Sequence, residues 1–106
     1  MQEVNIVNDK ESITAFIHGD IDHHTAKEIR EQIDKIIQET QPQLLNLDFS
    51  QVQFMDSSGI GLIMGRYRLM QMLNGTVKVI NIPTHLKRLI KISGLLGLGV
   101  IAKGEV

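Results

Sequence analysis

The segment FMDSSGIGLIMG, from Phe54 to Gly65, carries the clearest potential for chemistry in this sequence. Asp56, Ser57 and Ser58 follow an apolar run, and three glycines then interrupt a series of apolar residues at helical spacing. A glycine in a helix interior costs about 1 kcal/mol relative to alanine. The glycines therefore indicate that another group comes close to this backbone, and the two serines offer hydroxyls beside it.

Ser57 lies where a buried strand is predicted to end and a helix to begin. Asp56 is a favourable N-cap residue, which makes Ser57 the first residue of the helix. Free N–H groups and the positive end of the helix dipole stabilise a negative charge there, and a phosphate would add about −1.5 to −2 charges. Ser57 is thus a candidate phosphorylation site. Ordinary capping by Asp56, with glycines that pack against the sheet, is the alternative that these residues leave open.

Other sites are less well supported by the residue pattern. Asp20, Asp22, His23 and His24 have the side chains of a zinc site, but adjacent histidines on one turn rarely converge on one ion and no distant third ligand is evident. We therefore predict a polar turn and no metal. Around Ser57 the G-x-S-x-G elbow of serine hydrolases is absent, and no P-loop is present, so we predict neither a catalytic residue nor a cofactor. Weak nucleotide binding stays open.

Composition limits the classes of protein to consider. The chain has 106 residues, enough for one domain, with 42% hydrophobic and 22% charged residues. A net charge of −1 without a basic run argues against nucleic-acid binding. There is no cysteine, which fits a reducing compartment, and the longest apolar run, LLGLGVIA, is far shorter than the ~20 residues of a spanning helix. With no basic and apolar leader at the start, we expect a cytoplasmic domain without membrane contact.

Hydrophobic periodicity predicts alternating strands and helices that would position these residues. The opening residues indicate a hairpin of two strands, followed by the turn GDIDHHT and a helix that begins with the capping box Thr25–Glu28. The later elements are a short strand over 44–49, a helix from 57 to the Asn74-Gly75 pair, a strand over 77–82, a helix ending before Gly94 and a last short strand at 100–101. The order β-β-α-β-α-β-α-β predicts one α/β domain, with a mixed, mainly parallel sheet flanked by helices.

Three segments together resemble a known family. FMDSSGIGLIMGRY resembles the signature of bacterial anti-sigma factor antagonists, which are STAS domain proteins, with Ile60 in place of a leucine as the one departure. GDIDHHTA, from Gly19 to Ala26, resembles the family's turn into its first helix, although Asp20 replaces a glutamate. HLKRLIKISGLLG, from His85 to Gly97, resembles its last conserved helix. His23-His24 and the GRY at Gly65 are most similar to the sporulation branch.

The resemblance implies a STAS domain over residues 1–106 that acts as a protein-binding switch. In the family, the unphosphorylated antagonist binds an anti-sigma factor that is also a serine kinase, and so releases a sigma factor. Phosphorylation of the serine matching Ser57 ends this activity until a serine phosphatase restores it; ATP and Mg²⁺ belong to the kinase, and the antagonist is not an enzyme. The partner-binding residues so implied are Asp20, Asp22, His23, Asp56, Ser57, Ser58, Gly59 and Gly61. The alternative is a STAS scaffold subunit of a stress-signalling assembly, unphosphorylated or modified at Ser58.

Overall fold

The computed structural model describes residues 4–106. In chain order their elements are β1 (Val4–Asp9), β2 (Ser12–Ile21), α1 (Ala26–Thr40), β3 (Leu44–Met55), α2 (Ser57–Met72), β4 (Thr76–Ile80), α3 (Thr84–Ile92) and a short 3-10 helix, η1 (Leu95–Leu98). None of the helices within this range is long and apolar enough to cross a bilayer.

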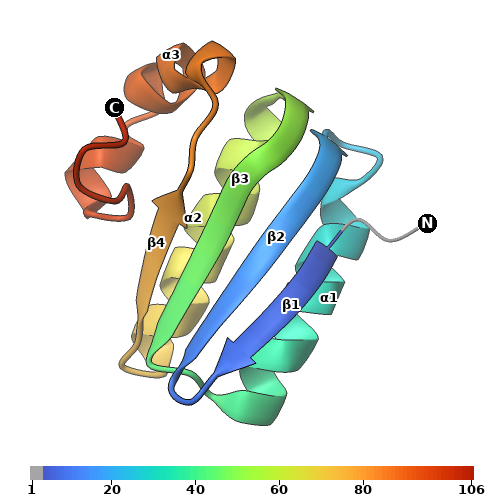
Figure 1. Ribbon diagram of the computed structural model, residues 1–106, viewed down its shortest axis with the longest axis vertical. Helices are drawn as coiled ribbons and strands as arrows, with labels where there is room; N and C mark the ends of the chain where they lie inside the picture. Colours follow the sequence, from blue (N-terminus) through green and yellow to red (C-terminus); the bar gives the residue numbers. More distant parts are fainter. Residues whose placement is uncertain (1–3) are drawn as a thin grey trace.

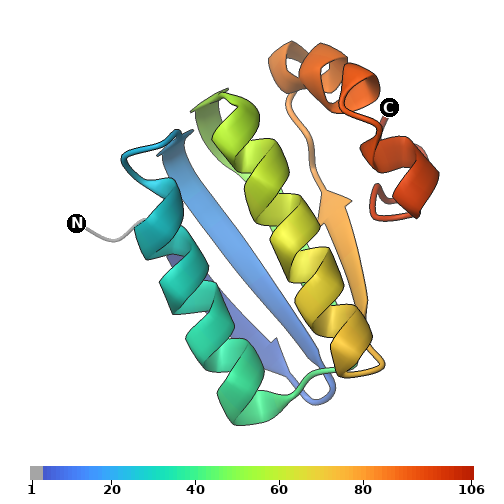
Figure 2. The same cartoon turned by 180° about the vertical axis from the view of Figure 1, so that it is seen from behind.

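The strands form one sheet in the order β1-β2-β3-β4. The β1–β2 hairpin is antiparallel, whereas β3 pairs in parallel with β2 on one side and with β4 on the other. Helices α1 and α2 lie side by side on one face of this sheet, and α3 and η1 lie beyond β4 at one of its ends (Figure 1; Figure 2). The predicted α/β fold with a mainly parallel sheet and an antiparallel opening hairpin is confirmed.

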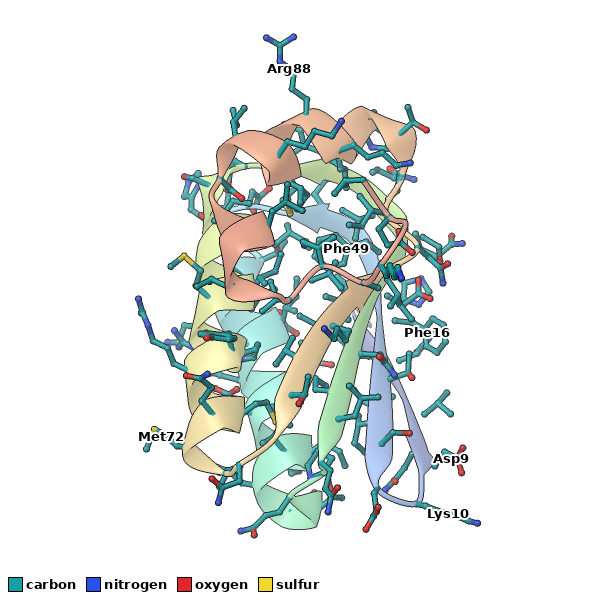
Figure 3. All side chains as sticks on the ribbon, turned by 90° about the vertical axis from the view of Figure 1, so that its left-hand side faces the viewer. Asp9, Lys10, Phe16, Phe49, Met72 and Arg88 are labelled. Atoms are coloured by element: carbon teal, nitrogen blue, oxygen red, sulfur yellow. The ribbon has the colours of Figure 1, made fainter. Side chains whose placement is uncertain are left out.

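The core lies between the sheet and the two helices. Helix α1 turns Ile29, Ile33 and Ile37 inward at a spacing of four residues, which places them on one face. Alternate residues of β2 and β3, such as Ile13 and Leu45, face them, because successive strand residues point to opposite sides. Figure 3 shows Phe49 inside the molecule and Phe16 on the sheet face turned away from the helices.

Strands β2 and β3 are longer than predicted. The first three residues of the predicted turn GDIDHHT are strand, since β2 continues to Ile21. Strand β3 continues to Met55 through polar residues that broke the hydrophobic alternation. Two register shifts, between Phe16 and His18 and between Gly19 and Asp20, allow the ladder to continue. A bulge inserts an extra residue without ending the pairing, which a period-two pattern cannot reveal.

The predicted last strand is reduced to a single bridge. Ile101 pairs in parallel with Val79, next to hydrogen bonds from the Val79 N–H to the Val100 oxygen (2.7 Å) and from the Ala102 N–H to the Val79 oxygen (3.1 Å). The carboxylate of Glu105 accepts from the N–H groups of Asn81 and Ile82, at 2.9 and 2.7 Å. The C-terminal residues therefore fasten to β4 and to the loop that follows it.

The three glycines of α2 differ in their surroundings. A Cβ at Gly59 would collide with Cγ and Sδ of Met55 and lie 3.4 Å from Cγ2 of Ile21. At Gly61 and Gly65, by contrast, an added Cβ would have no atom within 4 Å apart from chain neighbours and the helix backbone. Close packing inside the molecule thus explains Gly59 only.

We expect opposite effects from alanine at two of these positions. Gly59→Ala should lower the free energy of unfolding, because overpacking costs about 1–3 kcal/mol and outweighs the better helix propensity. Gly61→Ala should raise it by up to about 1 kcal/mol, since the methyl group enters open space. Urea denaturation of both variants provides the measurement, and equal effects in one direction would contradict the packing difference.

Candidate functional site

The predicted site residues meet at one end of the sheet, where β2 and β3 lead into the two helices (Figure 2). The parallel ladder pairs Asp20 with Phe54 and Ile21 with Met55. The N–H of Asp56 then donates to the carbonyl oxygen of Ile21 at 3.2 Å. The turn before α1 and the start of α2 are thereby held next to each other, although more than 30 residues of sequence separate them.

Ser57 is the exposed first residue of α2, as predicted. Asp56 has extended backbone and acts as the N-cap: its Oδ1 accepts from the Ser58 N–H at 2.7 Å, and its carbonyl oxygen accepts from the Gly59 N–H at 3.0 Å. The hydroxyl of Ser57 makes no hydrogen bond to any residue in the described range of 4–106. The junction therefore presents a free hydroxyl at the positive end of a helix dipole.

The turn before α1 is organised by Asp22. Its Oδ1 accepts from the N–H groups of His24 and Thr25, at 2.8 and 3.1 Å. Thr25 Oγ1 donates to the Asp20 carbonyl oxygen at 2.8 Å and accepts from the Asp22 N–H at 3.0 Å. The Thr25 side chain therefore bonds to the residues before it and not to the first turn of α1. The predicted capping box of Thr25 with Glu28 is wrong, because no side chain caps α1 from Thr25 and Asp22 takes the nearby N–H groups instead.

The remaining polar side chains of this turn are free to meet another molecule. Asp20, His23 and His24 are exposed, and the Asp20 carboxylate makes no hydrogen bond within residues 4–106. The rings of His23 and His24 pack with their centroids 3.9 Å apart and their planes tilted by 40°. Among the described residues, no three His, Asp or Glu side chains are grouped so as to hold a metal ion.

Two further residues reach the site that the sequence did not indicate. Phe54, which follows the second register shift of the β2–β3 ladder, is 52% exposed beside Asp20. A ring nitrogen of His85, in α3, lies 2.7 Å from the carbonyl oxygen of Gln53. The apolar run FM had suggested a buried strand end, and only the bulge turns Phe54 outward. The third family-like segment therefore touches the same end of the sheet.

A groove runs from this site between α1 and α2. It has a volume of about 290 Å³ and is lined by Ser58, Gly61 and Gly65 of α2 and by Lys27 and Arg30 of α1, among others. Gly61 is exposed there, whereas Gly59 is buried and contributes to packing behind the site. Seven of the eight predicted partner-binding residues thus lie at least partly exposed around the two junctions.

The Asp22 carboxylate provides a test of this arrangement by pH. The hydrogen bond from the His24 N–H, together with that from Thr25, lowers its pKa below the usual 3.8 of an aspartate. The ionised Asp22 carboxylate therefore stabilises the folded state fully at a pH above the pKa that Asp22 has in the unfolded chain. This stabilisation is lost as the pH falls through the lower pKa of Asp22 in the folded state. In an NMR titration, the His24 and Thr25 amides should respond with a midpoint below 3.8, and this response should vanish in Asp22→Asn. A midpoint at or above 3.8 would contradict the capping role.

The chain is similar in sequence to known proteins. The STAS domain family model matches residues 4–103. An anti-sigma F factor antagonist of Paenibacillus polymyxa is 39% identical over 90 residues, which are 85% of this chain and 77% of the relative. An anti-sigma-B factor antagonist of Bacillus subtilis is 28% identical over 103 residues, 96% of this chain and 93% of the relative.

Solved structures match the fold over almost the whole chain. The anti-sigma factor antagonist SpoIIAA in its unphosphorylated form superposes with a TM-score of 0.80 at 26% identity, over 93% of this chain and 85% of the other. The phosphorylated form of SpoIIAA, a Bacillus cell fate determinant, superposes with a TM-score of 0.72 at 26% identity. This match covers 93% of this chain and 88% of the other. The family predicted from the three sequence segments is confirmed, and this chain belongs to the STAS domain family.

Proposed function

We propose that this protein is an anti-sigma factor antagonist that is switched off by phosphorylation of Ser57. In its unphosphorylated form it binds a kinase-type anti-sigma factor in the cytoplasm and releases the sigma factor held there. The partner then phosphorylates Ser57 with its own ATP and Mg²⁺, and a serine phosphatase reverses the step. The chain itself is a substrate and a binding partner, and neither catalyses a reaction nor uses a cofactor.

The observation that carries the proposal is the free, exposed hydroxyl of Ser57 at the start of α2. Relatives named as antagonists of anti-sigma F and anti-sigma-B factors cover most of this chain, which supports the class of partner. Asp20, Asp22, His23 and Phe54 lie at the same end of the sheet and would offer further contacts for this partner.

A phosphate on Ser57 would act through its charge. It would bring about −1.5 to −2 charges to a surface that already carries Asp56 and Asp20, in the centre of an interface fitted to a neutral hydroxyl. Placing an unpaired charge in such an interface costs about 2–5 kcal/mol, which weakens affinity by a factor of ~30 to ~5000. The helix dipole at Ser57 offsets part of the repulsion within the free protein, so α2 can stay folded.

The comparison with SpoIIAA supports a switch without refolding. Its unphosphorylated and phosphorylated forms both superpose on this chain over 93% of its length. The fold of that protein is therefore kept in both states. For this chain we infer likewise that the added charge, rather than a rearranged backbone, decides whether the partner binds.

Aspartate at position 57 should imitate the switched-off state in part. Ser57→Asp is expected to fold with an unchanged circular dichroism spectrum and to bind the anti-sigma factor at least ~30-fold more weakly, because it introduces a charge at the docking centre. Titration calorimetry against the purified anti-sigma factor measures this, with Ser57→Asn as the neutral control of similar size. Tight binding by the aspartate variant would count against the electrostatic mechanism.

Phosphosite mapping tests the modification itself. The purified protein is incubated with the anti-sigma factor, ATP and Mg²⁺, and its intact mass and phosphopeptides are determined. We expect one phosphate on Ser57 in the natural chain and in Ser58→Ala, and none in Ser57→Ala, which should still bind. A phosphate on Ser58, or no phosphate together with self-assembly, would favour the scaffold alternative.

A further inference from the structure

Gly61 and Gly65 have no explanation within the fold. Both lie in the interior of α2, where glycine weakens a helix, and an alanine methyl at either position would point into open space. Gly59, two residues before Gly61, differs from them because the Met55 side chain occupies the space that a Cβ at Gly59 would need. Packing within this chain therefore does not account for Gly61 and Gly65.

The open space over these glycines is the groove between α1 and α2. Gly61 and Gly65 are four residues apart and so lie on one face of α2. With no side chains there, the helix backbone itself forms a wall of the 290 Å³ groove. Ser58 lines the same groove, which connects it directly to the start of α2 and to Ser57. A partner that covers Ser57 would cover the groove as well.

The charged side chains that line the groove are all cationic: Lys27, Arg30 and Arg66. Arg66 is buried, and its Nε lies 2.8 Å from Oδ1 of Asp34, so its charge is compensated inside the protein. Lys27 and Arg30 form no ion pair with any residue from 4 to 106. Arg30 interacts electrostatically with the Asp34 carboxylate but makes no direct ion pair with it, so Lys27 and Arg30 still present positive charge at a groove that is open to solvent.

We propose that this groove is a docking subsite for an acidic side chain of the anti-sigma factor. A glutamate or aspartate of that partner enters over Gly61 and Gly65, and its carboxylate pairs with Arg30 and Lys27. Arginine suits this role because its planar guanidinium can bind a carboxylate through two parallel hydrogen bonds. The proposal rests on the proposed function, since the groove shares Ser58 with the site around Ser57.

With this subsite, the surface formed by the site around Ser57 and the groove has one acidic end and one basic end. Asp20, Asp22 and Asp56 make the end around Ser57 acidic, whereas Lys27 and Arg30 make the groove basic. A partner with the complementary arrangement, a basic group facing the aspartates and an acidic group facing the groove, can bind in one orientation only, because the reversed orientation brings like charges together. The groove thus contributes to specificity as well as to affinity.

Filling the groove tests its use without disturbing the fold. Gly65→Leu and the double variant Gly61→Ala/Gly65→Ala should keep the native circular dichroism spectrum, and the alanine variant should melt no lower than the natural chain. Both should bind the anti-sigma factor at least ~10-fold more weakly in titration calorimetry. Gly97→Ala is the matched control: its methyl also enters open space, but it lies in η1 and outside the groove, so binding should stay within about twofold.

Charge reversal and crosslinking test the acidic character of the occupant. Arg30→Glu should weaken binding at least ~10-fold, whereas Lys35→Glu, which makes the same change in charge on an exposed position of α1 outside the groove, should have an effect of about twofold or less. A carbodiimide, which couples amines to carboxylates without adding a spacer, should join the Lys27 amine to an aspartate or glutamate of the anti-sigma factor, as identified by peptide mass spectrometry.

Each outcome decides between the two proposals. If the natural chain binds the anti-sigma factor and all groove variants bind equally well, the subsite is refuted and the proposed function stands. If the natural chain does not bind at all, the proposed function fails and the subsite fails with it. If the filled variants lose self-association in sedimentation experiments while binding to the anti-sigma factor is unchanged, the occupant is a second copy of this chain and the acidic subsite is refuted.

Discussion

The parallel pairing of β2 with β3 is the constraint on which the site depends. It carries both strands past the point where the hydrophobic alternation breaks and brings Ile21 next to Met55. The hydrogen bond from the Asp56 N–H to the Ile21 oxygen closes this pairing where both chains turn into helices. Because the carboxyl ends of parallel strands meet at one edge of a sheet, two polar segments distant in sequence form one surface. Without that register, Asp20 and Ser57 would not lie at the same end of the sheet.

At this edge, capping serves both structure and function. Asp56 and Asp22 each use a carboxylate oxygen to hold backbone N–H groups at the start of a helix, and in doing so they leave the Ser57 hydroxyl and the Asp20 carboxylate uncommitted. The two readings of Asp56-Ser57-Ser58, ordinary capping and a modifiable surface, are therefore compatible. The cap provides a rigid platform, and rigidity keeps the cost of ordering a docking surface low.

The glycines of α2 separate into two physical classes. Gly59 makes room for the Met55 side chain within the core, so it is required by folding alone. Gly61 and Gly65 weaken the helix and have no inner neighbour, and this contrast is the basis for the proposal that a partner enters the groove. Buried Arg66, held by Asp34, supports the floor of that groove while burial lowers the pKa of its guanidinium and raises that of the Asp34 carboxyl.

The sequence by itself determined the fold class, the order of the elements, the junction at Asp56-Ser57 and the family, because periodicity, helix caps and short motifs depend on neighbouring residues. Tertiary structure decided the rest. The bulges that extend β3 and expose Phe54, the replacement of the Thr25 capping box by Asp22, and the reduction of the last strand to one bridge all depend on pairing between distant segments. The different roles of three similar glycines were likewise decided by what lies opposite each one. Such contacts leave no periodic signal along the chain, since they join residues that the sequence keeps apart.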